Sequence, residues 1–462
     1  WKKPQNGWYR YDELATQLVP YLKEYGYNYI ELLPIGEHPC DESWGYQCSG
    51  FYSPTSRYGT LDDYKKMIDI LHHNDIGVIM DFVPVHFALD AYALAKFDGT
   101  ALYEYPRAHD ADSQWGTANF DLWKEEVRSF LMSAASFWID VYHVDGLRMD
   151  AISNAIFWHG NKQLGVNEGA LDFIKRMNFM LNEKYQGKIM LIAEDSTDFP
   201  NVTKSTLEGG LGFDYKWDLG WMNDTLNYLK KDPVYRKWHH NNITFSMAYF
   251  YSERFLIEFS HDEVVHGKAT IINKMWGTYE QKFAQLRTLY LYMFTHPGKK
   301  LNFMGNEFAQ FIEWNYTQGL DWLLLDYPMH KAMQRWCSAL NACYRSIRAL
   351  WDIDDGWDGF TWLNVDDAER SAIAFLRTAR NGRRLVCVCN FTPVRYDDFV
   401  IGLPRRGVLR ELLSSDSEEF GGSGVHNAPA IRSENVPFGT LPCSARVTLP
   451  ELAAVYFTFT NR

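Results

Sequence analysis

The sequence lacks any long hydrophobic run and any excess of positive charge. No stretch approaches the 18 or more apolar residues of a membrane-spanning helix. The formal net charge is -12 at pH 7, whereas nucleic acid or an anionic membrane requires a concentrated basic surface. We therefore expect no nucleic acid and no membrane as partner, and a neutral substrate suits this chain better.

Cysteines are few, odd in number and scattered, with 7 in 462 residues. None has zinc-ligand spacing, and Cys387 and Cys389 suit alternating positions of one strand, so we expect reduced thiols and a cytoplasmic protein. His261 and His266 enclose a glutamate but are five residues apart, whereas a zinc helix of the HExxH type needs four. We expect no metal and no cofactor.

Two sequence motifs of common enzyme classes are also absent. The chain has no glycine-rich phosphate loop and no serine nucleophile elbow, which argues against the common nucleotide-binding and esterase classes. Aromatic residues, in contrast, make up 16% of the chain, with 17 Trp and 28 Tyr. Flat rings with a polar edge stack well on sugar faces, although a large core would also use them.

A chain of this length suits two domains. Up to about residue 350, short β-type runs alternate with stretches of helical period, which is typical of a parallel sheet wrapped by helices. We expect an α/β fold with a (β/α)8 TIM-type barrel over residues 1–350. The β-type runs are seven, one fewer than a closed barrel needs, so one was missed or the first strand precedes Trp1. They are residues 29–33, 77–83, 142–149, 189–193, 213–217, 255–259 and 301–304.

Beyond about residue 350 the helical period disappears. Short strands separated by turn residues, such as 371–377, 385–390 and 453–460, predict an antiparallel β-sandwich over residues 351–462. Because there is no long linker, we expect the two domains to pack directly against each other.

Charged residues follow four of the predicted strands. In a parallel barrel the active site lies where the strands end. Each acid alone suits an ion pair or a strand-end cap, but several charges gathered at one rim are costly without a function. The residues concerned are Asp81 with His86, Arg148 with Asp150, Glu194, and His261 with Asp262.

Arg148 and Asp150 are two positions apart on one extended segment, so their side chains project to the same side. The guanidinium would keep Asp150 ionised, as a carboxylate nucleophile requires. Glu194 has the opposite requirement if it is a general acid. Burial and the like charges of Asp150 and Asp262 would raise its pKa toward roughly 6 to 7.

At these four places the sequence resembles the α-amylase superfamily of glycoside hydrolases and transglycosylases. The matching segments are DFVPVH at 81–86, GLRMDA at 146–151, AEDS at 193–196 and SHDE at 260–263. Within that superfamily the chain is most similar to the glycogen branching enzymes. The similarity rests on WGYQ at 44–47, SHDEVVHGK at 260–268, LNFMGNEF at 301–308, ELL at 411–413 and GGSG at 421–424.

The resemblance implies a glycosyltransferase that moves an α-1,4-linked glucan segment to a 6-hydroxyl in glycogen biosynthesis. It implies a retaining mechanism and an α-glucan such as glycogen or amylose as the partner. We also expect a monomer. By the same likeness Asp150 is the nucleophile, Glu194 the acid/base and Asp262 the stabiliser of the strained sugar. Four further residues, Asp81, His86, Arg148 and His261, would hold the sugar ring, and Tyr52 would stack beneath it.

The sequence departs from that family in three ways. The family's β-sandwich carbohydrate module and first barrel strand would precede Trp1, the stretch from Asp150 to Glu194 is short, and Phe82, Val85 and Met149 are unusual. Two alternatives remain open. One is an α-glucan hydrolase of the amylase or debranching type, and the other is a non-catalytic glucan-binding protein.

Overall fold

The structure, a computed structural model, describes residues 1–461 and divides into two compact units. The N-terminal unit comprises Lys2–Trp217 with Tyr316–Gly319. The C-terminal unit comprises residues 218–315 and the chain from residue 320 onward, together with Trp1. Among the described residues, no helix combines the length and the apolar character needed to cross a membrane.

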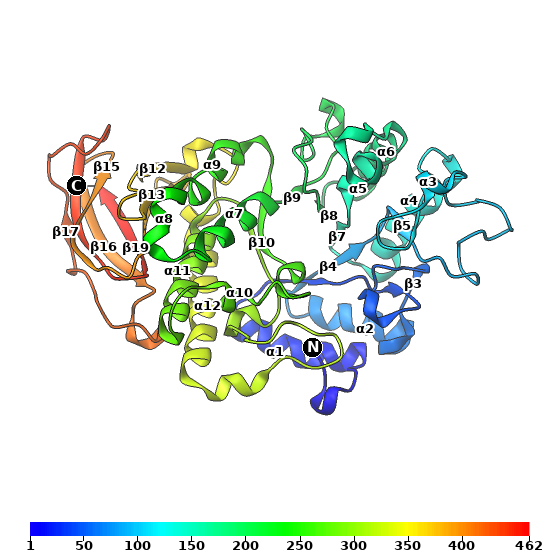
Figure 1. Cartoon of the computed structure of the whole chain (residues 1–462), viewed down its shortest axis with the longest axis horizontal. Coiled ribbons are helices and arrows are strands. Elements are labelled where there is room, and N and C mark those ends of the chain that lie inside the picture. The colour runs from blue at the N-terminus through cyan, green and yellow to red at the C-terminus, as the bar shows by residue number, and fades with distance from the viewer. Residues whose placement is uncertain (462) are drawn as a thin grey trace. The chain divides into compact units, whose positions relative to one another are not determined.

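Five parallel strands form the sheet of the N-terminal unit, each hydrogen-bonded to the next (Figure 1). In spatial order they are β1 (Tyr29–Leu32), β4 (Gly77–Phe82), β7 (Gly146–Met149), β8 (Met190–Ala193) and β9 (Tyr215–Trp217). The long helices that precede β1, β4, β7 and β8 are, in this order, α1 (Tyr11–Tyr25), α2 (Leu61–His72), α4 (Glu125–Tyr142) and α6 (Glu168–Tyr185). The expected alternation of strand and helix is confirmed.

Helix α2 shows how local sequence forms one of these units. The hydroxyl of Thr60 accepts from the backbone N–H of Asp63, whose carboxylate accepts from the N–H of Thr60. This capping box satisfies two donors at the helix start. Tyr64, Met67, Ile68 and Leu71 fall on one face and are all buried.

Strand β7 starts later than the expected residue 142. Helix α4 continues through Tyr142, and His143 then takes a left-handed conformation (φ 59°) that ends the helix. The alternating apolar residues before Gly146 therefore belong to the end of the helix and to the turn. The carboxyl end of β7, where the charged residues lie, is as expected.

Short elements occupy the long connections of this unit. Strands β2 (Gly36–Glu37) and β3 (Gly50–Pro54) pair, as do β5 (His86–Phe87) and β6 (Ala118–Asn119). The short helices are α3 (Ala108–Ala111) and α5 (Ile152–Ile156). The α5 helix directly follows the residues at the end of β7.

The C-terminal unit contains the last two expected barrel strands, β10 (Phe255–Phe259) and β11 (Lys299–Asn302), which pair in parallel. Strand β11 starts two residues before the expected position. Two lysines hid its start, because Lys300 Nζ folds back to donate to the carbonyls of His296 and Gly298. The helices here are α7 (Leu219–Leu229), α8 (Pro233–Arg236), α9 (Ser246–Tyr249), α10 (Ile271–Lys274), α11 (Tyr279–Thr295) and α12 (Pro328–Ser346).

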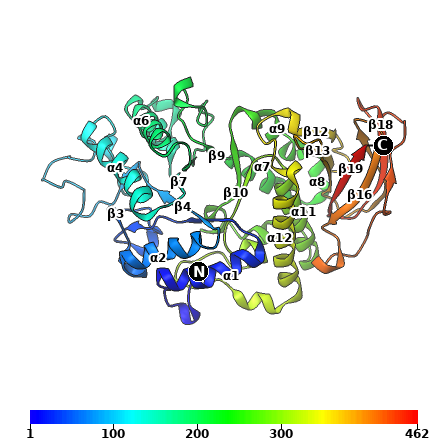
Figure 2. The ribbon, with the colours of Figure 1, turned by 180° about the vertical axis from the view of Figure 1, so that it is seen from behind.

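The expected antiparallel β-sandwich is confirmed in the same unit (Figure 2). One sheet has the order β12-β13-β14-β19-β16-β17, and β15 pairs with β18 in the other. Apolar residues of both sheets, including Val386, Phe399 and Phe457, form the core. The strands are β12 (Phe360–Asn364), β13 (Ala372–Thr378), β14 (Arg384–Asn390), β15 (Tyr396–Leu403), β16 (Gly407–Ser414), β17 (Ile431–Arg432), β18 (Cys443–Leu449) and β19 (Ala454–Asn461).

The sandwich packs directly on helix α11. Tyr292 of α11 contacts the rings of Phe375 and Phe391. Arg287 Nε donates to the backbone carbonyl of Ser415 at 2.7 Å, and the Thr288 hydroxyl donates to the backbone carbonyl of Leu452 at 2.6 Å. The direct packing expected from the short linker is therefore present. The domain boundary at residue 350 lies inside the C-terminal unit and stays a prediction.

Candidate active site

Arg148 of β7 lies at the centre of a buried charge cluster in the N-terminal unit. Its register partner on β4 is Asp81, so the two side chains leave the sheet on the same side. Arg148 Nη1 donates to Asp81 Oδ1 and Oδ2 at 2.8 and 2.7 Å, and to Asp150 Oδ1 at 2.8 Å. The guanidinium also lies 4.3 Å from the ring centroid of Trp217. The sequence-predicted pair Arg148 and Asp150 is thus in contact.

The two carboxyl groups that share Arg148 titrate differently. For Asp150, burial raises the pKa, but His86 and the Arg148 charge outweigh it and hold the pKa below its ordinary value. For Asp81, burial and the nearby Asp150 charge raise the pKa well above its ordinary value despite the Arg148 contact. Asp150 therefore stays ionised at neutral pH, which a carboxylate nucleophile requires.

His86, at the start of β5, lies against Asp150. Its Nε2 is 3.7 Å from Asp150 Oδ2, an electrostatic contact rather than a short hydrogen bond. The Trp115 ring packs on the imidazole, with ring centroids 4.8 Å apart. The buried Nδ1 of His86 has no hydrogen-bond partner among the described residues. The ring is therefore held by packing and by Asp150.

Glu194 directly follows β8, the neighbour of β7. Its carboxylate Oε2 accepts from the backbone N–H of Ala151 at 2.8 Å, and its carbonyl accepts from the N–H of Ile152 at 3.0 Å. Ala151 has a left-handed backbone (φ 52°), which turns the chain after Asp150. Ala151, the residue after Asp150, thus positions Glu194, so the two predicted catalytic acids lie on neighbouring strand ends joined by hydrogen bonds.

Tyr46 belongs to the cluster although sequence reasoning assigned it no role. Its hydroxyl donates to Asp81 Oδ2 at 2.6 Å and lies 3.4 Å from Arg148 Nη1. Tyr52, the aromatic residue selected from the sequence, is not in the cluster. Its hydroxyl donates to the carbonyl of Phe130, and its ring packs on Phe130 and Phe137 of α4. The sequence could have indicated Tyr46, because it lies in the WGYQ segment that the chain shares with the branching enzymes.

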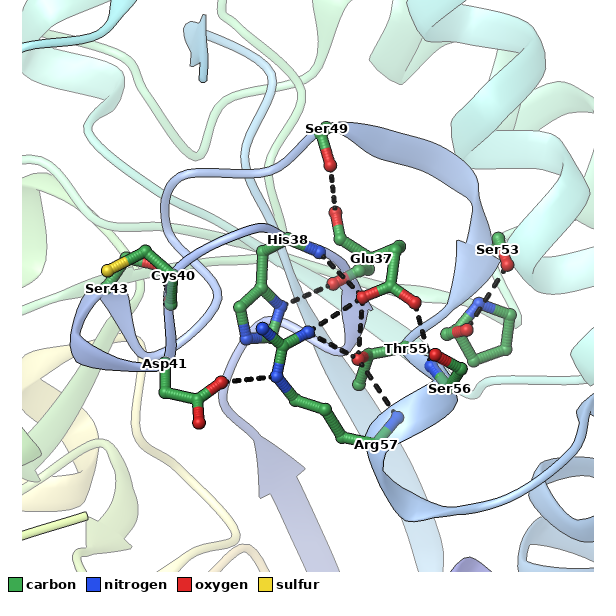
Figure 3. Close-up of polar contacts among 12 residues, drawn as sticks. Glu37, His38, Cys40, Asp41, Ser43, Ser49, Ser53, Thr55, Ser56 and Arg57 are labelled. Carbon is green, nitrogen blue, oxygen red and sulfur yellow. Dashed lines mark hydrogen bonds and ion pairs between the residues drawn. The ribbon is translucent and has the colours of Figure 1, made fainter. Parts of the chain in front are cut away.

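A polar network holds the loop that presents Tyr46 (Figure 3). Glu37 accepts from the Thr55 hydroxyl at 2.9 Å and from the Ser56 N–H at 2.8 Å. Arg57 Nη1 donates to Glu37 at 2.8 Å, and Arg57 Nε donates to Asp41 at 2.5 Å. These contacts join Glu37 of β2 to the residues that follow β3, and they join Arg57 to Asp41 within the β2–β3 connection, so they restrict the path of the loop.

Two other charged groups near these strand ends were missed from the sequence. Glu31 lies in β1, where burial raises its pKa to about 7 against the opposing effect of Arg148. The sequence could have indicated Glu31, because it is an acidic residue within an otherwise apolar strand. Asp195, next to Glu194, pairs with Lys216 of β9 at 2.8 Å, and both are buried. This pair anchors the segment after β8.

His261 and Asp262 lie in the C-terminal unit, in a short 3-10 turn after β10. His261 is buried, with its Nε2 3.5 Å from Asp262 Oδ1 and its ring 5.9 Å from that of Phe303. The Asp262 side chain is 54% exposed. Both residues thus follow the carboxyl end of a barrel strand, which is the position expected from the sequence.

Comparison with known proteins defines the fold class. Residues 15–106 match the family described as alpha amylase, catalytic domain, and residues 362–460 match alpha amylase, C-terminal all-beta domain. A solved alpha-amylase from Geobacillus thermoleovorans, complexed with acarbose, aligns with a TM-score of 0.72 at 18% identity, over 98% of this chain and 92% of that one. An Anoxybacillus alpha-amylase aligns with a TM-score of 0.68 at 19% identity, over 98% and 91%. The fold is an amylase-type barrel followed by an all-β domain.

More similar relatives specify the family. The 1,4-alpha-glucan branching enzyme of Halothermothrix orenii is 51% identical, over 100% of this chain and 75% of its own length. Those of Bacillus caldolyticus and Bacillus subtilis are 49% and 47% identical, over 97% of this chain and 68% and 72% of their lengths. The chain belongs to the 1,4-alpha-glucan branching enzymes, a glycosyltransferase group of the alpha-amylase family. The resemblance seen in the sequence is confirmed.

Proposed function

We propose that this chain catalyses glucan branching by a retaining double displacement centred on Asp150. The substrate is an α-1,4-glucan, and the product carries a new α-1,6 branch. The observation that carries the proposal is the cluster around Arg148, which keeps Asp150 ionised beside an acid, Glu194, held by the next backbone amide. An ionised nucleophile next to a second carboxyl group is the arrangement that retaining glycosidic chemistry uses.

In the first step Asp150 attacks the anomeric carbon while Glu194 gives its proton to the oxygen of the leaving glucan chain. The glycosidic bond breaks, and a covalent glycosyl ester on Asp150 forms. The lowered pKa of Asp150 supports its role as the attacking group, because protonation would remove its nucleophilic electron pair. The hydrogen bond that the Ala151 N–H donates to Glu194 Oε2 orients the Glu194 carboxyl group.

In the second step Glu194, now ionised, takes a proton from the 6-hydroxyl of a glucan acceptor. That oxygen attacks the anomeric carbon, the ester bond breaks, and Asp150 is regenerated. We assign Asp262 to stabilising the strained sugar and His261, His86, Asp81 and Arg148 to holding its ring. Tyr46 supports Asp81 in this role. For Tyr52 the contacts with α4 support a packing role instead.

The proposed setting is glycogen biosynthesis in the cytoplasm. All seven cysteines are free, and five of them are buried, which suits a reducing compartment. We also propose that the chain acts on α-glucan as a monomer, with no nucleic acid as partner. Sedimentation of the purified chain measures the oligomeric state.

Amylose turnover tests the proposal. Branching lowers iodine staining with few new reducing ends, whereas steady release of reducing ends would indicate an α-glucan hydrolase. Asp150→Asn is expected to lower the rate by about 1,000-fold or more, because the nucleophile is removed. Unchanged turnover in this variant would favour a non-catalytic glucan-binding protein or a different centre.

Asp145→Asn is the matched control. Asp145 lies just before the opposite end of the same strand, where its Oδ2 is 2.8 Å from His72 Nε2 and accepts from the Val78 N–H at 2.7 Å. The substitution affects a partly buried, hydrogen-bonded aspartate without touching the cluster. It is expected to lower the melting temperature while leaving turnover near that of the unmodified chain.

A further inference from the structure

A second group of potential ligands lies apart from the acids, in the N-terminal unit. His109 and Asp110 lie on the short helix α3, and His159 lies in the 3-10 turn Trp158–Gly160. One ligand atom from each of the three lies within 4.8 Å of the other two. The rings of His109 and His159 have centroids 5.1 Å apart at an interplanar angle of 36°.

His159 is held in an unusual state. Its backbone is left-handed (φ 54°), which is uncommon for a residue with a side chain. Its Nε2 is buried and has no hydrogen-bond partner among the described residues. Buried polar atoms are rarely left in this state, and a bound ion is one explanation for such an atom. Backbone strain of this kind concentrates at ligand sites.

We propose that His109, Asp110 and His159 bind a divalent transition metal of the zinc type. Two imidazole nitrogens and one carboxylate oxygen are borderline ligands that zinc accepts, and they leave a fourth tetrahedral position for water. Calcium and magnesium prefer oxygen ligands alone. Zinc ligands at bond lengths of about 2.0 to 2.1 Å lie roughly 3.3 Å apart. The exposed His109 side chain can rotate to close the remaining gap.

The metal would tie together two segments that border the Asp150 cluster. His109 lies in the connection from β5 to β6, which also carries Trp115 against the His86 ring. His159 follows α5, the helix after Asp150. The expected effect is a more stable chain and a firmer Trp115 segment. The proposed steps of glycosyl transfer give no role to a metal, so this inference stands apart from the proposed function.

Zinc titration of the full chain, by calorimetry and by equilibrium dialysis, tests the site. One zinc per chain is expected, with a rise in melting temperature and no competition from calcium or magnesium. His159→Gln and His109→Gln are each expected to weaken zinc binding by about tenfold or more. Binding of zinc by either variant with unchanged affinity, or no binding by the unmodified chain, would overturn the proposal.

His73→Gln is the matched control, because His73 Nδ1 also lies near a carboxylate, 3.3 Å from Asp69 Oδ1, but outside the proposed ligand group. It is expected to leave zinc binding unchanged. The absorption spectrum of bound cobalt separates nitrogen and oxygen ligands from thiolates, and thiolate bands would move the metal to one of the seven free cysteines and overturn the assignment. Amylose branching measured with a chelator is expected to match that of the untreated chain.

Discussion

Arg148 contacts two carboxyl groups through a single guanidinium nitrogen, and only Asp150 has a pKa below its ordinary value, whereas that of Asp81 is raised by burial. Asp81 receives hydrogen bonds from Arg148 and Tyr46, and Asp150 from Arg148 with His86 beside it. Removing one member of a buried ion cluster leaves an uncompensated charge, which typically costs about 3 to 5 kcal/mol. The side chains of this cluster are therefore strongly interdependent.

Tyr46→Phe tests the support that Tyr46 gives to Asp81. Removal of the hydroxyl leaves a buried Asp81 oxygen without one of its donors, which costs about 1 to 3 kcal/mol, so kcat/KM for amylose is expected to fall by about 5- to 100-fold. Tyr52→Phe is the control, because it removes one hydroxyl that donates to a backbone carbonyl. It is expected to reduce the free energy of unfolding by about 1 kcal/mol and to leave kcat/KM unchanged. Equal losses of kcat/KM would show that Tyr46 has no special role.

His86→Gln tests the pKa of Asp150. His86 is one of the groups that hold this pKa below its ordinary value, so its loss is expected to raise the pKa. The pH profile of kcat/KM should then lose activity at a higher pH on its acid side, since Asp150 becomes protonated earlier as pH falls. His72→Gln, which removes the partner of Asp145, is expected to leave the acid side in place. A shift to lower pH would contradict the assignment of Asp150 as nucleophile.

At the scale of elements, the β2–β3 connection decides whether Tyr46 reaches Asp81. Tyr46 and Asp81 are 35 positions apart, and no periodic pattern in the loop places one beside the other. Gly45, immediately before Tyr46, has φ +94°, and a Cβ there would lie 2.1 Å from the carbonyl oxygen of Pro34. Only glycine allows this close approach of two backbones.

Gly45→Ala is expected to displace Tyr46 and to lower kcat/KM by about tenfold or more, through loss of the Asp81 contact. Gly99→Ala is the matched control, because Gly99 also has positive φ (+87°) but no atom lies within 4 Å of its added Cβ. The control is expected to cost about 1 to 2 kcal/mol of stability from backbone strain alone. Equal activity of the two variants would show that the close approach to Pro34 is unimportant.

For the molecule as a whole, buried histidines link stability to pH. Burial lowers the pKa of His296 to about 3, and the nearby Lys300 charge adds to the effect. The Ser246 hydroxyl lies 2.9 Å from its Nε2, and its Nδ1 lies 3.1 Å from the carbonyl of Pro297. Burial also lowers the pKa of His38, His240 and His330. The folded chain therefore keeps these rings neutral.

The free energy of unfolding is expected to fall as pH drops from about 6.5 to about 3. In that range His296 binds a proton in the unfolded chain but not in the folded chain. The stabilisation that the neutral His296 ring gives to the folded chain is therefore complete only above the histidine pKa of the unfolded chain. The slope is up to about 1.4 kcal/mol per pH unit for each such histidine. Denaturant unfolding at several pH values measures it.

His296→Gln should reduce this slope by up to about 1.4 kcal/mol per pH unit, which corresponds to one bound proton. His73→Gln, at a position whose side chain is 74% exposed, should keep the original slope. A slope that does not change in the His296 variant would show that other groups account for the acid sensitivity.

Much of this architecture could be predicted because its signals are local. The seven strand segments, the helix faces and the sandwich follow from periodicity and turn residues, and the polar residues stand directly after apolar strands. Errors arose where polar residues masked an element, as at the start of β11, or where a helix ran longer than expected, as at Tyr142. The resemblance to the branching enzymes also followed from short contiguous motifs.

The sequence by itself determined the type of chemistry, because the acids, the arginine and the strands that carry them are encoded within short segments. Only the tertiary structure decided that Tyr46 supports Asp81, that the Tyr52 hydroxyl donates to a carbonyl of α4, that the Ala151 amide holds Glu194, and that His109 lies beside His159. These contacts join residues far apart in the chain through irregular loops. The path of such a loop depends on packing, backbone sterics and hydrogen bonds of the whole unit, for which no local pattern exists.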